Sequence, residues 1–192
     1  PQGSGPNPDV VASTPKGRSI AFEVKNTPSG LVDYGQSDLY FDNGQWVLVS
    51  DNPHLEKSFE ILRDKIPQNS GIPTRRTSVS QDERNSLALR PASVDIPVEN
   101  ITNYYSQKNR FMFVKSTDSV YCLKSDDPLI KEGIPYFQDK VKRAQAVFRI
   151  KNQGSKAPPN SRYRFKLTQR IPKENDIDRG MGLDDALPLI FP

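Results

Sequence analysis

The sequence contains little of the chemistry on which most enzymes depend. Histidine and cysteine each occur once in 192 residues, as His54 and Cys122. A histidine-dependent catalytic triad would have to use His54, and no nucleophile motif accompanies it. One histidine and one cysteine are too few for a typical zinc site, and no glycine pattern of a phosphate-binding loop occurs. We therefore expect a protein that is not an enzyme and that needs no cofactor or metal.

A cysteine pair, a long apolar run and a secretion signal are also missing. Cys122 has no second cysteine with which to form a disulfide, so the fold does not depend on an oxidising compartment. Its place between Tyr121 and Leu123 is typical of a buried strand residue. No apolar run approaches the roughly 20 residues of a membrane-spanning helix. The first eight residues show neither the basic nor the apolar region of a secretion signal.

We accordingly expect a cytoplasmic location, or a place within a particle assembled there. Pro1 fits a processed end and the removal of an initiator methionine equally well. The sequence does not decide between these two origins.

Hydrophobic residues are scarce and make up 34% of the chain, against roughly 45–50% in an average globular protein when glycine is counted. There are 17 prolines and 11 glycines, which interrupt regular structure. These values argue against a long helical bundle and against a compact α/β enzyme. They do not indicate full disorder, because one Trp, nine Phe and seven Tyr supply large side chains for a core. The composition predicts a modest core of strands with long irregular segments.

Alternating apolar and polar residues predict several strands. In residues 19–25, apolar side chains occupy every second position, which is the pattern of a half-buried strand. Residues 39–41 and 46–49 flank Asn43-Gly44, a dipeptide that favours the tight turn of a β-hairpin because both residues tolerate a positive φ. Two later pairs of strands are predicted, at 110–115 with 119–124 and at 145–151 with 162–169.

One amphipathic helix is predicted from Asn52 to Ile66. Asn52 can cap its N-terminus, and Pro53 suits the first turn because the N–H that proline lacks has no helical partner there. Its apolar residues share one face: Leu55, Phe59, Leu62 and Ile66. A shorter helix is predicted directly after Ser80, which has the spacing of a capping box with Glu83.

These elements indicate a mainly β fold, with an antiparallel sheet or small sandwich, one amphipathic helix and long irregular arms. Five segments follow from the pattern: an extended N-terminal arm at 1–18, a β-hairpin plus helix at 19–66, an irregular connection at 67–103, an antiparallel β region with a basic face at 104–172, and an acidic, then apolar, C-terminal tail at 173–192. The sequence leaves open whether 19–66 and 104–170 form one sheet or two subdomains.

The basic residues are concentrated in one part of the chain. Residues 141–173 hold ten of the 27 Lys and Arg and none of the 23 Asp and Glu, which leaves 17 basic and 23 acidic residues elsewhere. The formal charge of the whole chain is +4. If the strands at 145–151 and 162–169 pair, their alternation places five cations on one sheet face: Arg149, Lys151, Arg162, Arg164 and Lys166.

Like charges this close repel each other unless something neutralises them. Three sources of neutralisation are open: the phosphate backbone of a nucleic acid, an acidic protein surface, which includes the chain's own C-terminal tail, and solvent with screening salt. Tyr163 and Phe165 alternate onto the opposite face of their strand. The pattern therefore favours contact with a nucleic-acid backbone or a protein over the stacking of bases on aromatic rings.

The C-terminal tail places two acidic residues before an apolar end. Its apolar side chains are Leu187, Leu189, Ile190 and Phe191. Such an end is typical of a docking peptide that binds a neighbouring subunit. The alternative is that it folds back onto the chain's own core.

In an assembly, extended ends, irregular segments and a surface with one sign of charge can each contact a neighbouring subunit. These contacts offset the conformational entropy that is lost when the segments become ordered. We therefore expect an oligomeric, non-enzymatic structural subunit of a large complex, such as a virion or a similar particle, with other protein subunits as its partners. The alternative is a nucleic-acid-binding protein that contacts the phosphate backbone through 141–173. The two functions can coexist, because particle proteins often face a nucleic acid.

Overall fold

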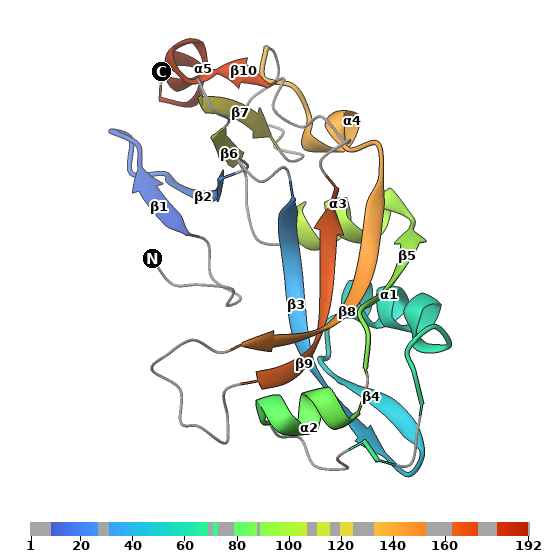
Figure 1. Ribbon diagram of the computed structural model, residues 1–192. Coiled ribbons are helices and arrows are strands. Elements are labelled where there is room, and N and C mark those ends of the chain that lie inside the picture. Colours follow the sequence, from blue (N-terminus) through green and yellow to red (C-terminus); the bar gives the residue numbers. More distant parts are fainter. Residues whose placement is uncertain are drawn as a thin grey trace. The chain divides into compact units, whose positions relative to one another are not determined.

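The computed structural model describes residues 9–26, 31–68, 71–72, 79–87, 89–106, 111–115, 120–124, 133–152, 163–172 and 180–191. These residues form a mainly β structure, as the sequence predicts (Figure 1). The chain divides into two compact units: unit 1 holds Pro1–Tyr34, Pro97–Ala144 and Ile171–Pro192, and unit 2 holds Gly35–Ile96 and Gln145–Arg170. Among the described residues, no helix is both long and apolar enough to cross a membrane.

Unit 1 is built on a five-stranded sheet. Its strands, in order across the sheet, are β1 (Val10–Ser13), β2 (Ser19–Asn26), β6 (Phe111–Lys115), β7 (Val120–Lys124) and β10 (Met181–Gly182). The predicted strands at 19–25, 110–115 and 119–124 are confirmed. Neighbouring strands are antiparallel except for β2 and β6, which run parallel. This pair differs from the expected antiparallel sheet because a long connection through unit 2 separates the two strands and lets the chain return in the same direction.

The core of unit 1 combines residues from distant parts of the chain. Its buried members are Ile20, Phe22, Cys122 and Ile134, together with Ala186 and Ile190 of helix α5 (Leu183–Ile190). Gly180 allows a close approach just before β10, since a Cβ at this position would lie 2.3 Å from the carbonyl oxygen of Cys122. Only glycine fits this contact without a shift of the backbone.

Two further helices belong to unit 1. α3 (Val98–Ser106) contacts α4 (Phe137–Lys140) and buries Ile101 and Tyr104. The sequence places the first turns of α3 in the irregular connection, because Asn and Thr are poor helix formers. Burial of its apolar residues stabilises the helix where local propensity does not.

Unit 2 contains most of a second five-stranded sheet. Its strands, in order, are β4 (Gln45–Val49), β3 (Val32–Asp42), β9 (Tyr163–Ile171), β8 (Ala144–Asn152) and β5 (Ala92–Ile96). The predicted hairpin is confirmed, because β3 and β4 pair antiparallel across Asn43 and Gly44, whose φ angles are 47° and 79°. The predicted strands β8 and β9 also pair antiparallel.

Trp46 lies at the centre of the unit 2 core and is 2% exposed. Its ring centroid lies 5.3 Å from that of Phe41 and 5.0 Å from those of Phe148 and Phe165, in edge-to-face contacts. Aromatic rings in this geometry add stabilisation beyond the area that they bury. A chain with few hydrophobic residues thus concentrates its largest ones in one place.

Helix α1 (Pro53–Arg63) is the predicted amphipathic helix, and it ends before the expected residue 66. The Asn52 side chain caps it by accepting a hydrogen bond from the backbone N–H of His54 at 3.0 Å. Gln169 of β9 donates to the His54 carbonyl oxygen at 2.9 Å and to Ser58 Oγ at 2.7 Å. α1 therefore lies on the face of the sheet to which Gln169 points, and the residues that alternate with Gln169 point to the other face.

Segments that the sequence predicts as irregular contain short regular elements. The expected N-terminal arm contains β1, which pairs with β2, and its first eight residues lie outside the described residues. The expected connection contains α2 (Gln81–Ser86) and β5, and the capping box between Ser80 and Glu83 is confirmed. The expected tail contains β10 and α5. Short elements are stabilised by pairing and burial more than by local propensity, so composition does not reveal them.

Candidate functional site

Four of the five predicted cations lie on one face of the unit 2 sheet. The register of β8 and β9 places Arg149 opposite Lys166 and Lys151 opposite Arg164. Residues directly opposite each other in an antiparallel pair share a face. We call these four residues the basic face. Arg162, the fifth predicted member, lies outside the described residues.

The opposite face of β8 and β9 belongs to the core. Phe148 and Phe165 are fully buried there, and their ring centroids lie 6.0 Å apart. Tyr163 alternates with Arg164 and lies under the guanidinium of Arg84, 5.9 Å from it. The aromatic rings of these strands are therefore not available for base stacking beside the basic face, as the alternation predicts.

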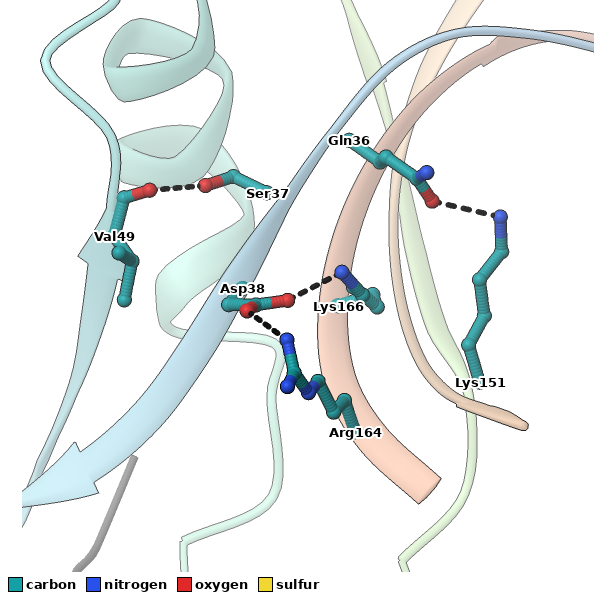
Figure 2. A network of polar contacts seen from close by, with 7 residues as sticks. All are labelled: Gln36, Ser37, Asp38, Val49, Lys151, Arg164 and Lys166. Carbon is teal, nitrogen blue, oxygen red and sulfur yellow. Dashed lines mark hydrogen bonds and ion pairs between the residues drawn. The ribbon is translucent and has the colours of Figure 1, made fainter. Parts of the chain in front are cut away.

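A carboxylate from the neighbouring strand β3 reaches the basic face. Asp38 forms ion pairs with Lys166 and with Arg164, the latter at 3.0 Å between Oδ2 and Nη1 (Figure 2). Gln36, two residues earlier on β3, accepts a hydrogen bond from Lys151 Nζ at 2.9 Å. The repulsion within the basic face is thus reduced by the chain itself, and the acidic group comes from β3.

The basic face brings four cations together, and Asp38 forms ion pairs with two of them. The side chains of Asp38 and Lys166 are only 19% and 16% exposed, so their ion pair is shielded from water. Arg164 is 41% exposed. An arginine carries five N–H donors, and the bond to Asp38 uses only one nitrogen. Arg164 therefore keeps donors that can bind an oxyanion from solution.

The basic face ends where the same surface becomes buried. Val147 and Thr168 form the next pair toward the other end of the strands, and both are buried. Beyond them, Gln145 donates a hydrogen bond to Asp95 of β5 at 3.1 Å. The candidate contact surface is accordingly limited to the part of β8 and β9 that holds the two cation pairs.

Sequence reasoning missed the contribution of β3. Gln36, Asp38 and Tyr40 occupy alternate positions, so they share one face of the strand, and Tyr40 is half-buried there. The alternation is visible in the sequence. The pairing of β3 with β9 is not, because the two strands lie more than 100 residues apart in the chain.

The predicted docking residues of the C-terminal tail are divided between two environments. Ile190 is buried in the unit 1 core, and the Phe191 ring centroid lies 6.2 Å from that of Phe22. Leu187 and Leu189 are 38% and 41% exposed. The tail therefore folds back onto its own core as helix α5, and only its outer side remains available to another molecule.

The pKa values of the single cysteine and the single histidine are both shifted from their ordinary values. Cys122 is buried, and burial raises the pKa of its thiol to about 12, so the reactive thiolate does not form near neutral pH. Partial burial, and then the nearby charge of Lys57, lower the pKa of His54. The backbone carbonyl of His54 accepts hydrogen bonds from Gln169 and from the hydroxyl of Ser58.

An open hollow of about 310 Å³ lies in unit 2 between β4 and α1. Its charged lining residues are Glu56, Glu60 and Arg63, and the guanidinium of Arg63 lies 5.0 Å from the ring centroid of Phe59. Within the part of the chain that the structure describes, no three His, Cys, Asp or Glu side chains are grouped to hold a metal ion.

Comparison of the chain with protein-family models, with curated proteins and with solved structures gives no match. The chemistry of the chain's own residues is therefore the guide to its function. Among the described residues, the basic face is the arrangement that most clearly indicates a kind of ligand.

Proposed function

We propose that the chain is a non-enzymatic subunit of a larger assembly that contacts the phosphate backbone of a nucleic acid through the basic face. The observation that carries the proposal is the register of β8 and β9, which places two cation pairs next to each other on one sheet face. Opposite side chains start about 5 Å apart and alternate ones on a strand about 7 Å apart. Four cations in so small an area favour a ligand with several negative charges.

The chemistry of the face favours backbone contact without base readout. Lys and Arg bind phosphate oxygens, which position a nucleic acid but carry no sequence information. The aromatic side chains of β8 and β9 lie on the face opposite the basic face, where Phe148 and Phe165 are buried. Tyr40 of β3, which shares the face of Asp38, is half-buried. We therefore expect binding that depends strongly on salt and weakly on base sequence.

The assembly part of the proposal is supported by exposed apolar residues of unit 1. Val10 and Val11 of β1 and Leu187 and Leu189 of α5 are each at least 38% exposed. Apolar groups gathered at an edge strand and on one helix are features of interaction surfaces. A virion or a similar particle, in which subunits bind both one another and a genome, would use the two surfaces together.

The test is fluorescence anisotropy with a labelled mixed-sequence single-stranded oligonucleotide at low salt. Replacing both Lys151 and Arg164 by Glu should weaken binding at least about tenfold, because four units of charge change on the basic face. The matched control replaces Lys57 and Lys65 by Glu. These lysines are exposed on and after α1, so the net charge changes equally while the basic face stays intact.

Two results would contradict the proposal. An equal loss of affinity in both double variants would mean that only the net charge matters. Absence of binding by the wild type at low salt, together with binding of a poly-glutamate peptide, would favour an acidic protein as the partner of the basic face. Circular dichroism of each variant verifies that the fold is retained.

A further inference from the structure

The outer side of β1 is an exposed sheet edge. β1 is the end strand of the unit 1 sheet, and no strand in the described part of the chain pairs with its outer side. Natural proteins protect exposed edges with charged residues or proline. Val10–Ser13 contains neither. Val10 is 48% and Val11 is 59% exposed. The edge therefore presents backbone hydrogen-bonding groups and apolar side chains together.

The hydrogen bonds of the hairpin between β1 and β2 fix which backbone groups point outward. The N–H of Thr14 donates to the carbonyl oxygen of Arg18 at 2.8 Å. Thr14 and Arg18 continue the register of the two strands, in which Ser13 lies opposite Ser19. Hydrogen-bonded and non-hydrogen-bonded pairs alternate along an antiparallel ladder. The N–H and C=O groups of Val11 and Ser13 therefore point away from β2 and toward the open edge.

Charged residues mark the two ends of this edge. Asp9 precedes β1, and its carboxylate accepts a hydrogen bond from the N–H of Val24 at 2.9 Å. At this end of the hairpin, a hydrogen bond from a side chain thus takes the place of a backbone hydrogen bond between β1 and β2. Lys16 lies in the turn beyond the other end and is exposed. The edge accordingly has a negative charge at its start and a positive charge just past its end.

We propose that a second copy of this chain pairs with β1, antiparallel and about a two-fold axis at Ala12. Val11 of each copy then lies opposite Ser13 of the other, so every outward N–H and C=O of these residues finds a partner. In this register Asp9 of each copy faces Pro15 of the other, next to Lys16, whereas parallel pairing would bring like charges together. The small side chain of Ala12 meets its counterpart at the axis, where the two backbones come closest.

The pairing joins the two unit 1 sheets into one continuous sheet and covers part of the exposed Val10 and Val11 side chains. Ala12 already packs against the core of unit 1, so the second copy extends an existing apolar layer. This inference deepens the assembly part of the proposed function. It does not involve the basic face, and its test measures mass instead of oligonucleotide binding, so the two can fail separately.

The first test is sedimentation equilibrium of the full chain at concentrations up to about 1 mM, where even weak pairing is populated. The wild type should approach twice the chain mass of 21.6 kDa as concentration rises. Val11→Lys places a charge on the edge, and Ser13→Pro removes an outward N–H that β2 does not use. Each should weaken pairing at least about tenfold.

The matched control for Val11→Lys is Ile61→Lys. Ile61 is 39% exposed on α1 of unit 2, so an exposed apolar side chain is again replaced by lysine but away from the edge. Ile61→Lys should associate as the wild type does. Equal weakening by both substitutions would overturn the proposal, because the added charge alone would then explain the effect.

The second test is oxidative crosslinking at the axis. The Cα atoms of a non-hydrogen-bonded antiparallel pair lie about 4.5 Å apart, which suits a disulfide. Ala12→Cys should therefore form a covalent dimer, whereas Ala21→Cys on β2 should not. The native Cys122 is buried and does not compete. A wild type that stays monomeric, or a dimer that Ala12→Cys does not crosslink and that Ser13→Pro leaves intact, would overturn the proposal.

Discussion

The two sheets of this chain differ in what each leaves unsatisfied. In unit 2, the basic face carries a repulsion that Asp38 reduces from within the same sheet. In unit 1, the edge of β1 presents hydrogen-bonding groups for which the described residues supply no partner strand. A single side chain can balance charge, but only another strand can complete a sheet edge. We therefore expect unit 2 to bind an ionic ligand and unit 1 to bind a strand from a second molecule.

The cores of the two units also differ in kind. Unit 2 is organised around the rings of Trp46, Phe148 and Phe165. The unit 1 core holds mostly aliphatic side chains with one buried thiol, and the helix from the chain's C-terminus completes it. Substitutions in the two cores should therefore cost different amounts of stability.

The largest effect is expected from Trp46→Ala. Removing this ring leaves a cavity among three aromatic neighbours and should lower the free energy of unfolding by about 3–5 kcal/mol. Urea unfolding followed by far-ultraviolet circular dichroism measures the change, since Trp46 is the only tryptophan and its fluorescence is lost. A cost below about 1 kcal/mol would mean that the aromatic cluster does not organise unit 2.

Ile190→Ala should have the next largest effect. Ile190 is 1% exposed in the unit 1 core, so its truncation should cost about 2–4 kcal/mol. Leu187→Ala, on the outer side of the same helix, is the matched control and should cost less than about 1 kcal/mol. Similar costs for the two variants in urea unfolding would show that α5 is not held on the core in solution.

Asp38→Asn separates stability from binding in unit 2. Loss of the ion pairs with Arg164 and Lys166 should lower the free energy of unfolding by about 1–2 kcal/mol. The same change makes the basic face more positive, so affinity for a single-stranded oligonucleotide should rise about two- to tenfold. Chemical unfolding and anisotropy on the same samples provide both values. Weaker binding by Asp38→Asn would indicate that Asp38 organises the site and does not compete with the ligand.

The smallest effect is expected from the buried thiol of unit 1 at high pH. Burial raises the pKa of Cys122 in the folded state to about 12, whereas the unfolded chain ionises near the ordinary value. Stability from this group is fully present below the unfolded pKa and is lost as pH rises above it. Between about pH 8 and pH 10, the wild type should lose about 1 kcal/mol more than Cys122→Ala. Parallel stability curves for the two proteins would mean that the thiol is solvated.

Local signals in the sequence predicted much of the fold. Asn43-Gly44 indicated the hairpin of β3 and β4, and the spacing of Leu55, Phe59 and Leu62 indicated α1. These patterns succeed because turn geometry and helical periodicity depend on neighbours within a few residues. Elements such as α3 and α5 were missed, since they are stabilised by burial of a few side chains against distant parts of the chain.

The candidate site was predictable only in part, for the same physical reason. The alternation of Arg164 and Lys166 with Phe165 predicted that the cations share one face if the two strands pair. The structure shows the pairing and gives the register of β8 and β9. The counter-ion could not be predicted. Asp38 joins the site through a contact between strands that are far apart in sequence, and no local pattern records that contact.

The salt dependence of oligonucleotide binding is the decisive measurement for the basic face. Each of its cations that binds a phosphate should contribute about −0.7 to the slope of the logarithm of the binding constant against the logarithm of salt concentration for a single strand. Replacing Lys151 and Arg164 by Gln should reduce the magnitude of that slope by about 1.4, whereas Lys57→Gln with Lys65→Gln should leave it unchanged. A slope near zero, or one that the two double variants alter equally, would contradict the claim that the basic face binds a phosphate backbone.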